Sequence, residues 1–322
     1  MALPRSRRFT LKEARAVAAR NNLWIALVLL VGVLSLASDS FRKVANLQNI
    51  LAQNGIVGIV AIGMLVMMIS GGFDLSVGAV GSAVAVCAAY VSVQTNLVVA
   101  IAVSLALGIL LGSVNGFLIA KIGINSFIVT FALASIVTGV LLVLTNGGSV
   151  IGRSPQLQDF AFGRVGGIPL LFWSFLIFAS LTHVLLARTK WGHWIYSAGA
   201  NAHASYLSGV PVVSVKFGAF AFGGLAVGIG GMLLFGQSAI GQPTGAAGWP
   251  LSAIAICVIG GTSLNGGIGR VSSVIAAVLL LGVVANGLNQ LGISPYWQPA
   301  VTGTIILIAV LANQIGQQRR PS

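Results

Sequence analysis

Long apolar segments separated by short polar ones fill the chain from residue 22 to residue 315. A helix needs about 20 apolar residues to cross the hydrocarbon core of a bilayer. This length predicts an all-α polytopic membrane protein with some short or broken spans. The ten predicted spans lie near residues 22–38, 46–70, 75–95, 97–120, 124–145, 168–187, 214–238, 250–264, 270–292 and 297–315.

Basic residues predict how these spans are oriented, because Lys and Arg accumulate in cytoplasmic connections. With the N-terminus in the cytoplasm, 13 of the 17 Lys and Arg residues lie on the cytoplasmic side, and the four exceptions are Arg42, Lys43, Arg153 and Arg164. We therefore expect a cytoplasmic basic segment (1–21), a transmembrane domain (22–315) and a cytoplasmic tail (316–322).

Composition agrees with a membrane protein and excludes other classes. With 57% hydrophobic residues, 7% charged residues and a mean hydropathy of +1.00, the chain has too few charges to cover a soluble domain. The net charge of +13 lies in the connections between spans, so we expect no nucleic-acid partner. Cys87 and Cys257 both lie inside apolar segments, which gives no support to a disulfide or metal framework.

A break with a carboxylate interrupts the apolar pattern between residues 59 and 81. Gly71 and Gly72 are followed by Asp74, which alone of the four acidic residues is closely flanked by apolar segments. An ionisable group in such a place indicates a functional site, because burying it unpaired costs about 3 kcal/mol or more. Asp74 can cap the third span at its cytoplasmic end, or it can carry protons in a secondary transporter or channel. The predicted topology favours the cap.

Motifs of catalysis are missing from the sequence. The chain contains no GxxxxGK[ST] loop, no HExxH and no GxSxG. It therefore cannot hydrolyse ATP by itself, and we expect no catalytic residue and no cofactor. His183, His193 and His203 are ten residues apart, which is too far for a local metal cluster, so we expect no metal site.

The connection 188–213 is predicted to be cytoplasmic and reads TKWGHWIYSAGANAHASYLSGVPV over residues 189–212. It combines cations, aromatic residues and small residues, as a short amphipathic helix that docks onto a partner would. An ordinary loop with a surface helix is the alternative. Ala204, Ser205 and Gly209 match the spacing with which importer permeases present a coupling helix to an ATPase.

Six motifs in order carry a family resemblance. They are SGGFDLSVG at 70–78, NG at 115–116, INSFIVTFA at 124–132, TKWGHWIYSAGANAHASYLSG at 189–209, AIAICVIGGTSLNGGIG at 253–269 and NGL at 286–288. Together they resemble the permease family of bacterial ATP-binding cassette (ABC) importers for monosaccharides, the group for ribose, xylose, arabinose and autoinducer-2. The resemblance extends from about residue 22 to residue 315.

The resemblance implies a permease subunit in the bacterial inner membrane that moves a monosaccharide or related polyol. Its implied partners are a second permease subunit, as a homodimer or heterodimer, a cytoplasmic ABC ATPase that holds ATP and Mg, and a periplasmic sugar-binding protein. The implied ATPase-coupling residues are Thr189, Lys190, Trp191, Gly192, Gly199, Asn201, Ala204, Ser205 and Gly209.

Two departures from the family pattern stand out. The family usually has Ala-Ala-Arg where this chain has Ala204-Ser205-Tyr206, and often Gly-x-x-Glu-Leu where it has Gly248-Trp249-Pro250-Leu251. Contacts with the ATPase and the reception of substrate on the outer side are therefore expected to differ in detail.

Amide and hydroxyl side chains near the breaks are candidates for the substrate pathway, because they exchange hydrogen bonds with a neutral sugar without burying charge. The alternative is that these side chains hold helices together, as most Asn residues in membrane spans do. The candidates are Asn54, Ser76, Asn115, Asn125, Ser126 and Asn286.

Overall fold

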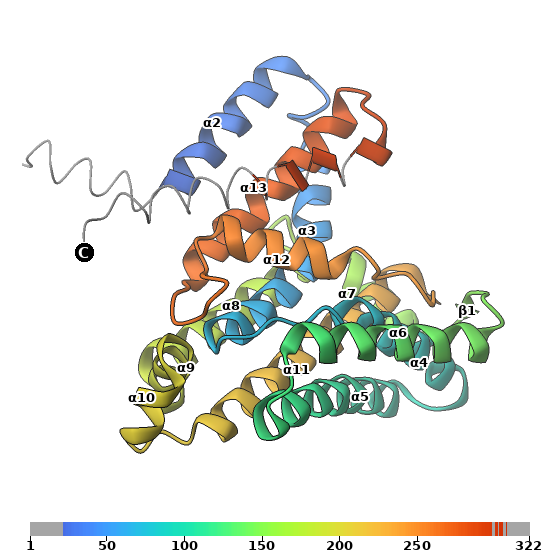
Figure 1. Cartoon of the computed structure of the whole chain (residues 1–322). Helices are drawn as coiled ribbons and strands as arrows, with labels where there is room; N and C mark the ends of the chain where they lie inside the picture. The colour runs from blue at the N-terminus through green and yellow to red at the C-terminus, as the bar shows by residue number, and fades with distance from the viewer. Residues whose placement is uncertain (1–21, 298–299, 302, 305–306, 308–322) are drawn as a thin grey trace, which may run out of the picture.

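The computed structural model describes residues 22–297, 300–301, 303–304 and 307. The predicted N-terminal segment 1–21, most of the predicted tenth span 297–315 and the tail 316–322 lie outside the described residues. In the described part, the chain is almost entirely helical (Figure 1), which confirms the all-α fold class.

Seven helices of the described part are long and apolar enough to cross a membrane. They are α3 (Val44–Ile69), α4 (Val77–Gln94), α5 (Leu97–Phe117) with the π-helical turn η1 (Leu118–Ile122), α6 (Ser126–Thr145), α8 (Leu170–Arg188), α11 (Val212–Ser238) and α13 (Val271–Gln290).

Shorter elements complete the described chain. The apolar helices α2 (Asn22–Ala37) and α12 (Trp249–Ile259) match the first and eighth predicted spans, although α12 ends five residues earlier than predicted. The connections contain α7 (Pro155–Phe162), α9 (Lys190–Ala200), α10 (Ala202–Leu207) and the 3-10 turn η2 (Pro295–Trp297). Strand β1 (Val150–Ile151) pairs antiparallel with β4 (Ile240–Gly241), and β2 (Arg164–Val165) pairs antiparallel with β3 (Ile168–Pro169).

Helix α3 lies at the centre of the bundle. Its residues from Ile59 to Ile69 are all buried, and it packs against α8, α11, α12 and α13. Glycine permits a close contact with α8: a Cβ added at Gly55 would lie 2.6 Å from the carbonyl oxygen of Leu171. A helix that is apolar all round is suited to such a buried position.

Glycines also bring α5 against α11. A Cβ at Gly108 would lie 2.6 Å from the oxygen of Gly224, and one at Gly112 would lie 2.7 Å from the Cα of Gly224. Small residues at such a crossing let two backbones approach closely, which gives the van der Waals contact that holds membrane helices together.

Connections that are predicted on the same side of the membrane lie at the same end of the bundle. β1 and β4 come from two predicted outer connections, and α9 and α10 lie at the opposite end of the bundle from β1 (Figure 1). Gln48 Nε2 donates to the Gly167 oxygen over 2.8 Å, which joins the start of α3 to the connection that contains β1. Connections predicted on one side therefore meet on that side.

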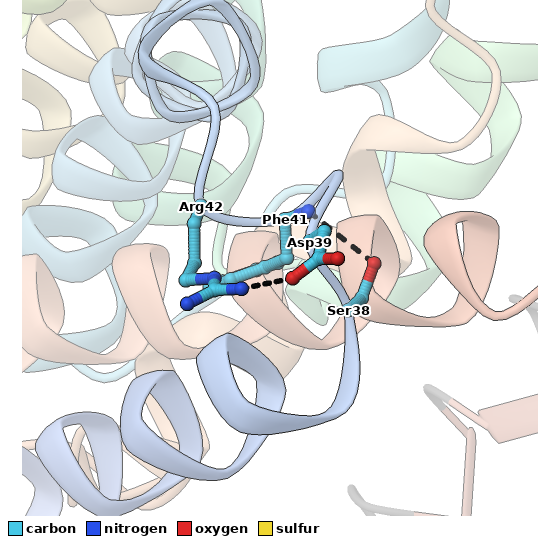
Figure 2. Close-up of polar contacts among 4 residues, drawn as sticks. All are labelled: Ser38, Asp39, Phe41 and Arg42. Carbon is cyan, nitrogen blue, oxygen red and sulfur yellow. Dashed lines mark hydrogen bonds and ion pairs between the residues drawn. The ribbon is translucent and has the colours of Figure 1, made fainter.

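The turn between α2 and α3, which is predicted to lie on the outer side, contains local polar contacts (Figure 2). Arg42 pairs with Asp39, and the N–H of Phe41 donates to Ser38 Oγ over 3.3 Å. The Phe41 side chain is fully buried in a small core with residues of α2, α3 and α13. The ion pair is exposed, so we expect it to contribute little to stability.

Candidate functional site: the helix break and the cytoplasmic docking segment

The break after α3 is a glycine turn. Gly71 has a φ of +92°, and its N–H donates to the Met68 oxygen, while the N–H of Gly72 donates to the Met67 oxygen. This left-handed conformation favours glycine and satisfies the last carbonyls of the helix. The chain then turns sharply into α4.

Asp74 lies in this turn, where three hydrogen bonds reach its carboxylate. Oδ1 accepts from the backbone N–H of Ser76 (2.7 Å) and from Ser76 Oγ (2.6 Å), and Oδ2 accepts from Asn115 Nδ2 (3.0 Å). The three side chains are buried. All three contacts donate to the Asp74 side chain, while Asn115 Oδ1 is buried without a hydrogen-bond partner in the described part of the chain. The N–H bound by Oδ1 belongs to Ser76, the residue before α4, so this bond lies one position outside the helix and the cap interpretation stays a prediction.

The same corner joins three helices. Asn115 belongs to α5 and also donates to Ser76 Oγ over 2.9 Å, while the N–H of Leu75 donates to Thr130 Oγ1 of α6 over 3.0 Å. The start of α4 is therefore fixed to α5 and α6 by buried polar contacts. Buried networks of this kind are costly to disturb because each lost partner leaves a desolvated group.

The predicted amphipathic helix of connection 188–213 is two helices with a cap each. Thr189 Oγ1 accepts from the N–H of Gly192 (3.1 Å) at the start of α9, and Asn201 Oδ1 accepts from the N–H of Ala204 (2.9 Å) at the start of α10. Gly209 ends the segment with a φ of +80°. Asn201 interrupts the helix because its side chain caps the following turn.

Gly199 of α9 lies where three predicted cytoplasmic segments meet. A Cβ added there would overlap the carbonyl oxygen of Ile69, at the end of α3, and would lie 2.7 Å from the nitrogen of Gly267 in the connection between α12 and α13. The N–H of Gly267 donates to that same Ile69 oxygen over 2.9 Å. Tyr196 adds a further contact between α9 and the connection that leads to α13, since its hydroxyl donates to the Gly269 oxygen over 2.9 Å.

The docking segment, α9 and α10, is exposed on the side that faces away from the bundle. Tyr206 and Leu207 of α10 are 70% and 72% exposed, whereas Ser205 is buried beside them. Lys190 and Ala204 are also exposed, and Trp191 packs against Gly218 of α11. The segment therefore has an inner face fixed to the bundle and an outer face free to contact another protein.

The remaining pathway candidates lie in separate places. Asn286 and Asn46 exchange amide hydrogen bonds of 2.9 and 2.8 Å at the predicted outer ends of α13 and α3. Asn54 Nδ2 donates to the oxygen of residue 50 in its own helix, and Asn125 caps α6 through the N–H of residue 127. Ser126 lies near Gly72 at the inner end. Of the six candidates, the structure joins Ser76 and Asn115 by a hydrogen bond.

Sequence reasoning missed several residues of these contacts. Asn46 and Gln290, which both bond to the Asn286 cluster, and the glycines at 267 and 269 were not singled out. Asn46 carried a signal, as a polar residue at the edge of an apolar span. Within the described residues, no group of three His, Cys, Asp or Glu side chains could hold a metal ion.

Comparisons with known proteins give a consistent similarity. Residues 46–310 match a family model described as the permease component of the branched-chain amino acid transport system. The ribose import permease protein RbsC of Escherichia coli K12 is 37% identical over 90% of this chain and 92% of its own length. RbsC of Bacillus subtilis is 36% identical over 90% and 91%, and the L-arabinose transport system permease protein AraH of Escherichia coli K12 is 37% identical over 87% and 86%. No solved structure matches the chain.

Proposed function

The chain belongs to the family of branched-chain amino acid transport system permease components, and from this premise we propose that it is the membrane-spanning subunit of an ABC importer for a monosaccharide or related polyol in a bacterial inner membrane. It is a multi-pass membrane protein and not itself an enzyme. ATP and Mg belong to a separate ATPase, and membership of the family implies both that ATPase and a substrate-binding protein.

The observation that carries the mechanism is the docking of α9. Its outer side continues into the exposed α10, and its Gly199 lies against the end of α3 and against the connection that leads to α13. A push on α9 from a bound ATPase would therefore reach two core helices through packed backbone. Packed interfaces transmit such displacements because they deform little.

We assign the exposed face of α10, which points away from the bundle, as the ATPase contact. Tyr206 stands where the family usually has Arg, so this contact is aromatic and apolar, with Leu207 beside it. Thr189 and Asn201 act as the caps that hold α9 and α10 in place, and Gly192 lets α9 approach the end of α8. ATPase that co-purifies with the wild-type chain and is lost on Tyr206→Glu would support this assignment, and retention of the ATPase would contradict it.

A second permease subunit is the remaining partner that we propose. We place the contact on helix α6, whose exposed side chains include Phe131 and Val143. Translocation would then follow the interface or the central helices by alternating access. Cross-linking of single cysteines on α6 between two copies in native membranes would test homodimerisation. Cross-links to a different permease subunit, without cross-links between two copies of this chain, would indicate a heterodimer.

The substrate class is tested by comparing sugars with amino acids. The relatives named for ribose and arabinose match the chain over most of its length, whereas the family description names branched-chain amino acids. Uptake of labelled ribose, arabinose and leucine should be measured in cells that express the chain with its ATPase and binding protein. Sugar uptake without leucine uptake is expected, and the reverse result would reject the sugar proposal.

The pathway residues remain candidates. Asn115 and Ser76 lie beside the break between α3 and α4, where a displacement of the turn would alter the pathway. Asn286 and Asn54 face the contact of α3 with α13. Substitutions that change the apparent affinity for sugar without changing the amount of folded protein would identify the residues that contact substrate.

A further inference from the structure

A cavity of about 300 Å³ lies at the cytoplasmic end of the bundle, between α8, α9 and the start of α13. Two of its lining residues are Tyr196, which binds the Gly269 oxygen, and Arg270. Burial raises the pKa of the Tyr196 hydroxyl, while the nearby Arg270 guanidinium acts to lower it. The complete lining is His183, Leu186, Ala187, Tyr196, Arg270, Val271 and Ser272.

The positive charge of this cavity has no acidic partner among the described residues. Asp39 pairs with Arg42 on the outer side, Asp74 is buried in its own network, and Asp159 lies in α7 of the outer connection. Arg270 therefore presents an uncompensated guanidinium. His183 and Ser272 are exposed beside it and add further hydrogen-bonding groups.

The cavity lies beside an exposed apolar surface of α8, near the end of this helix that is predicted to be cytoplasmic. Ile177, Leu181 and Val184 form an exposed apolar stripe on α8, with exposed fractions of 57%, 65% and 53%. Ala187 lines the cavity and lies three residues after Val184, in the last turn of a helix that ends at Arg188, so the stripe and the cavity adjoin there. Acyl chains of a lipid would cover such a stripe in a membrane.

We propose that this cavity binds the phosphate headgroup of an anionic membrane lipid, with Arg270 as its cation and the α8 stripe as the surface for its acyl chains. Basic pockets between membrane helices on the cytoplasmic side recognise such headgroups, and a guanidinium matches two phosphate oxygens at once. The apolar stripe favours a lipid over free phosphate. The site is independent of the substrate that the chain transports.

Native mass spectrometry of the full chain tests this proposal. The protein is released from nanodiscs of phosphatidylglycerol and phosphatidylcholine in equal amounts, and the retained lipids are counted. The wild type should retain phosphatidylglycerol preferentially. Arg270→Gln should lower the apparent affinity for phosphatidylglycerol about fivefold, as expected for removing one basic residue at an anionic surface. Lys121→Gln is the matched control, because Lys121 is another exposed cation of the predicted cytoplasmic side and does not line the cavity.

A second variant guards against misfolding of the first. Ala187→Leu narrows the rim while keeping the charge, and it should also reduce retention of phosphatidylglycerol. Inorganic phosphate at millimolar concentration should leave the lipid bound. An equal loss in Lys121→Gln would overturn the proposal, as would displacement of the lipid by inorganic phosphate. Unchanged lipid retention by Arg270→Gln would reject the lipid, and loss of the ATPase from this variant in a separate co-purification would assign the cavity to the ATPase.

Discussion

Replacing Gly199 by Ala should uncouple transport from the ATPase. The added Cβ would overlap the Ile69 oxygen and come within 2.7 Å of the Gly267 nitrogen, whereas real Cβ contacts stay beyond 3.0 Å. Both neighbours are backbone atoms of packed segments, so they cannot rotate away. Helix α9 must therefore retreat by about 1 Å, and overpacking of this kind costs about 1–3 kcal/mol.

The displacement of α9 also weakens the hydrogen bond between Gly267 and Ile69. The 2.9 Å hydrogen bond from Gly267 to Ile69 passes beside the new methyl group, and its loss would cost about 1 kcal/mol more. Alanine is the better helix former by about 1 kcal/mol, which offsets part of this cost without removing the overlap. A coupling free energy of 1–3 kcal/mol corresponds to about 5–150-fold in linked equilibria, so we expect sugar uptake to fall about tenfold.

The assay is uptake per ATP hydrolysed in proteoliposomes that contain the chain, its ATPase and its binding protein. Gly139→Ala is the matched control, because a Cβ there meets nothing within 4 Å. The control should transport as the wild type does, and both variants should insert in equal amounts. Wild-type uptake per ATP by Gly199→Ala would refute the reasoning that α9 transmits motion through this contact.

Three further predictions follow from buried contacts. Asp74→Asn removes the acceptor that faces Asn115 and should destabilise the protein by about 1–3 kcal/mol, measured as a lower thermal midpoint in detergent. The exchange of both residues, with Asn115→Asp added, should restore part of the lost stability. If Asp74 were a proton carrier, the exchanged protein would instead stay inactive in transport. Asn286→Leu leaves the buried amide of Asn46 without this partner and should cost about 1–2 kcal/mol with an unchanged apparent affinity for sugar, and a changed affinity would favour a pathway role. Gly108→Ala should separate α5 from α11, cost about 1–3 kcal/mol and reduce the amount of folded protein on size exclusion, and an unchanged yield would contradict this glycine contact.

The span pattern could be predicted from the sequence because length and hydropathy are local properties. Nine of the ten predicted spans have a helix in the described part, and the tenth lies mostly outside it. Helix α12, in the eighth predicted span, ends early, at Ile259, because Gly260 and Gly261 follow it and Gly261 takes a φ of +77°. The glycine pair was visible in the sequence, but hydropathy alone extended the span beyond it.

The convergence at Gly199 could not be predicted. Gly71, Gly199 and Gly266 are far apart in the sequence, yet a Cβ at Gly266 would lie 2.8 Å both from the Gly199 oxygen and from the Gly71 Cα. Glycine occurs 42 times in the chain, so its presence does not identify a contact. Only the packing of three connections at one end of the bundle distinguishes these glycines from the others.

The pathway candidates illustrate the same limit for polar residues. Ser76 and Asn115, two of the six candidates, lie together with Asp74, whereas Asn286 bonds to Asn46, which is not among the candidates. A polar side chain in a span signals that a partner is needed. It does not signal which helix provides that partner, because the pairing depends on long-range packing.

The most direct test of the permease assignment is reconstituted uptake of labelled ribose and arabinose. The chain is placed in proteoliposomes with or without its ATPase, its binding protein and ATP. We predict accumulation of sugar only when all three are present, with no dependence on an imposed proton gradient. Accumulation by the chain alone, driven by a proton gradient and abolished by Asp74→Asn, would contradict the account.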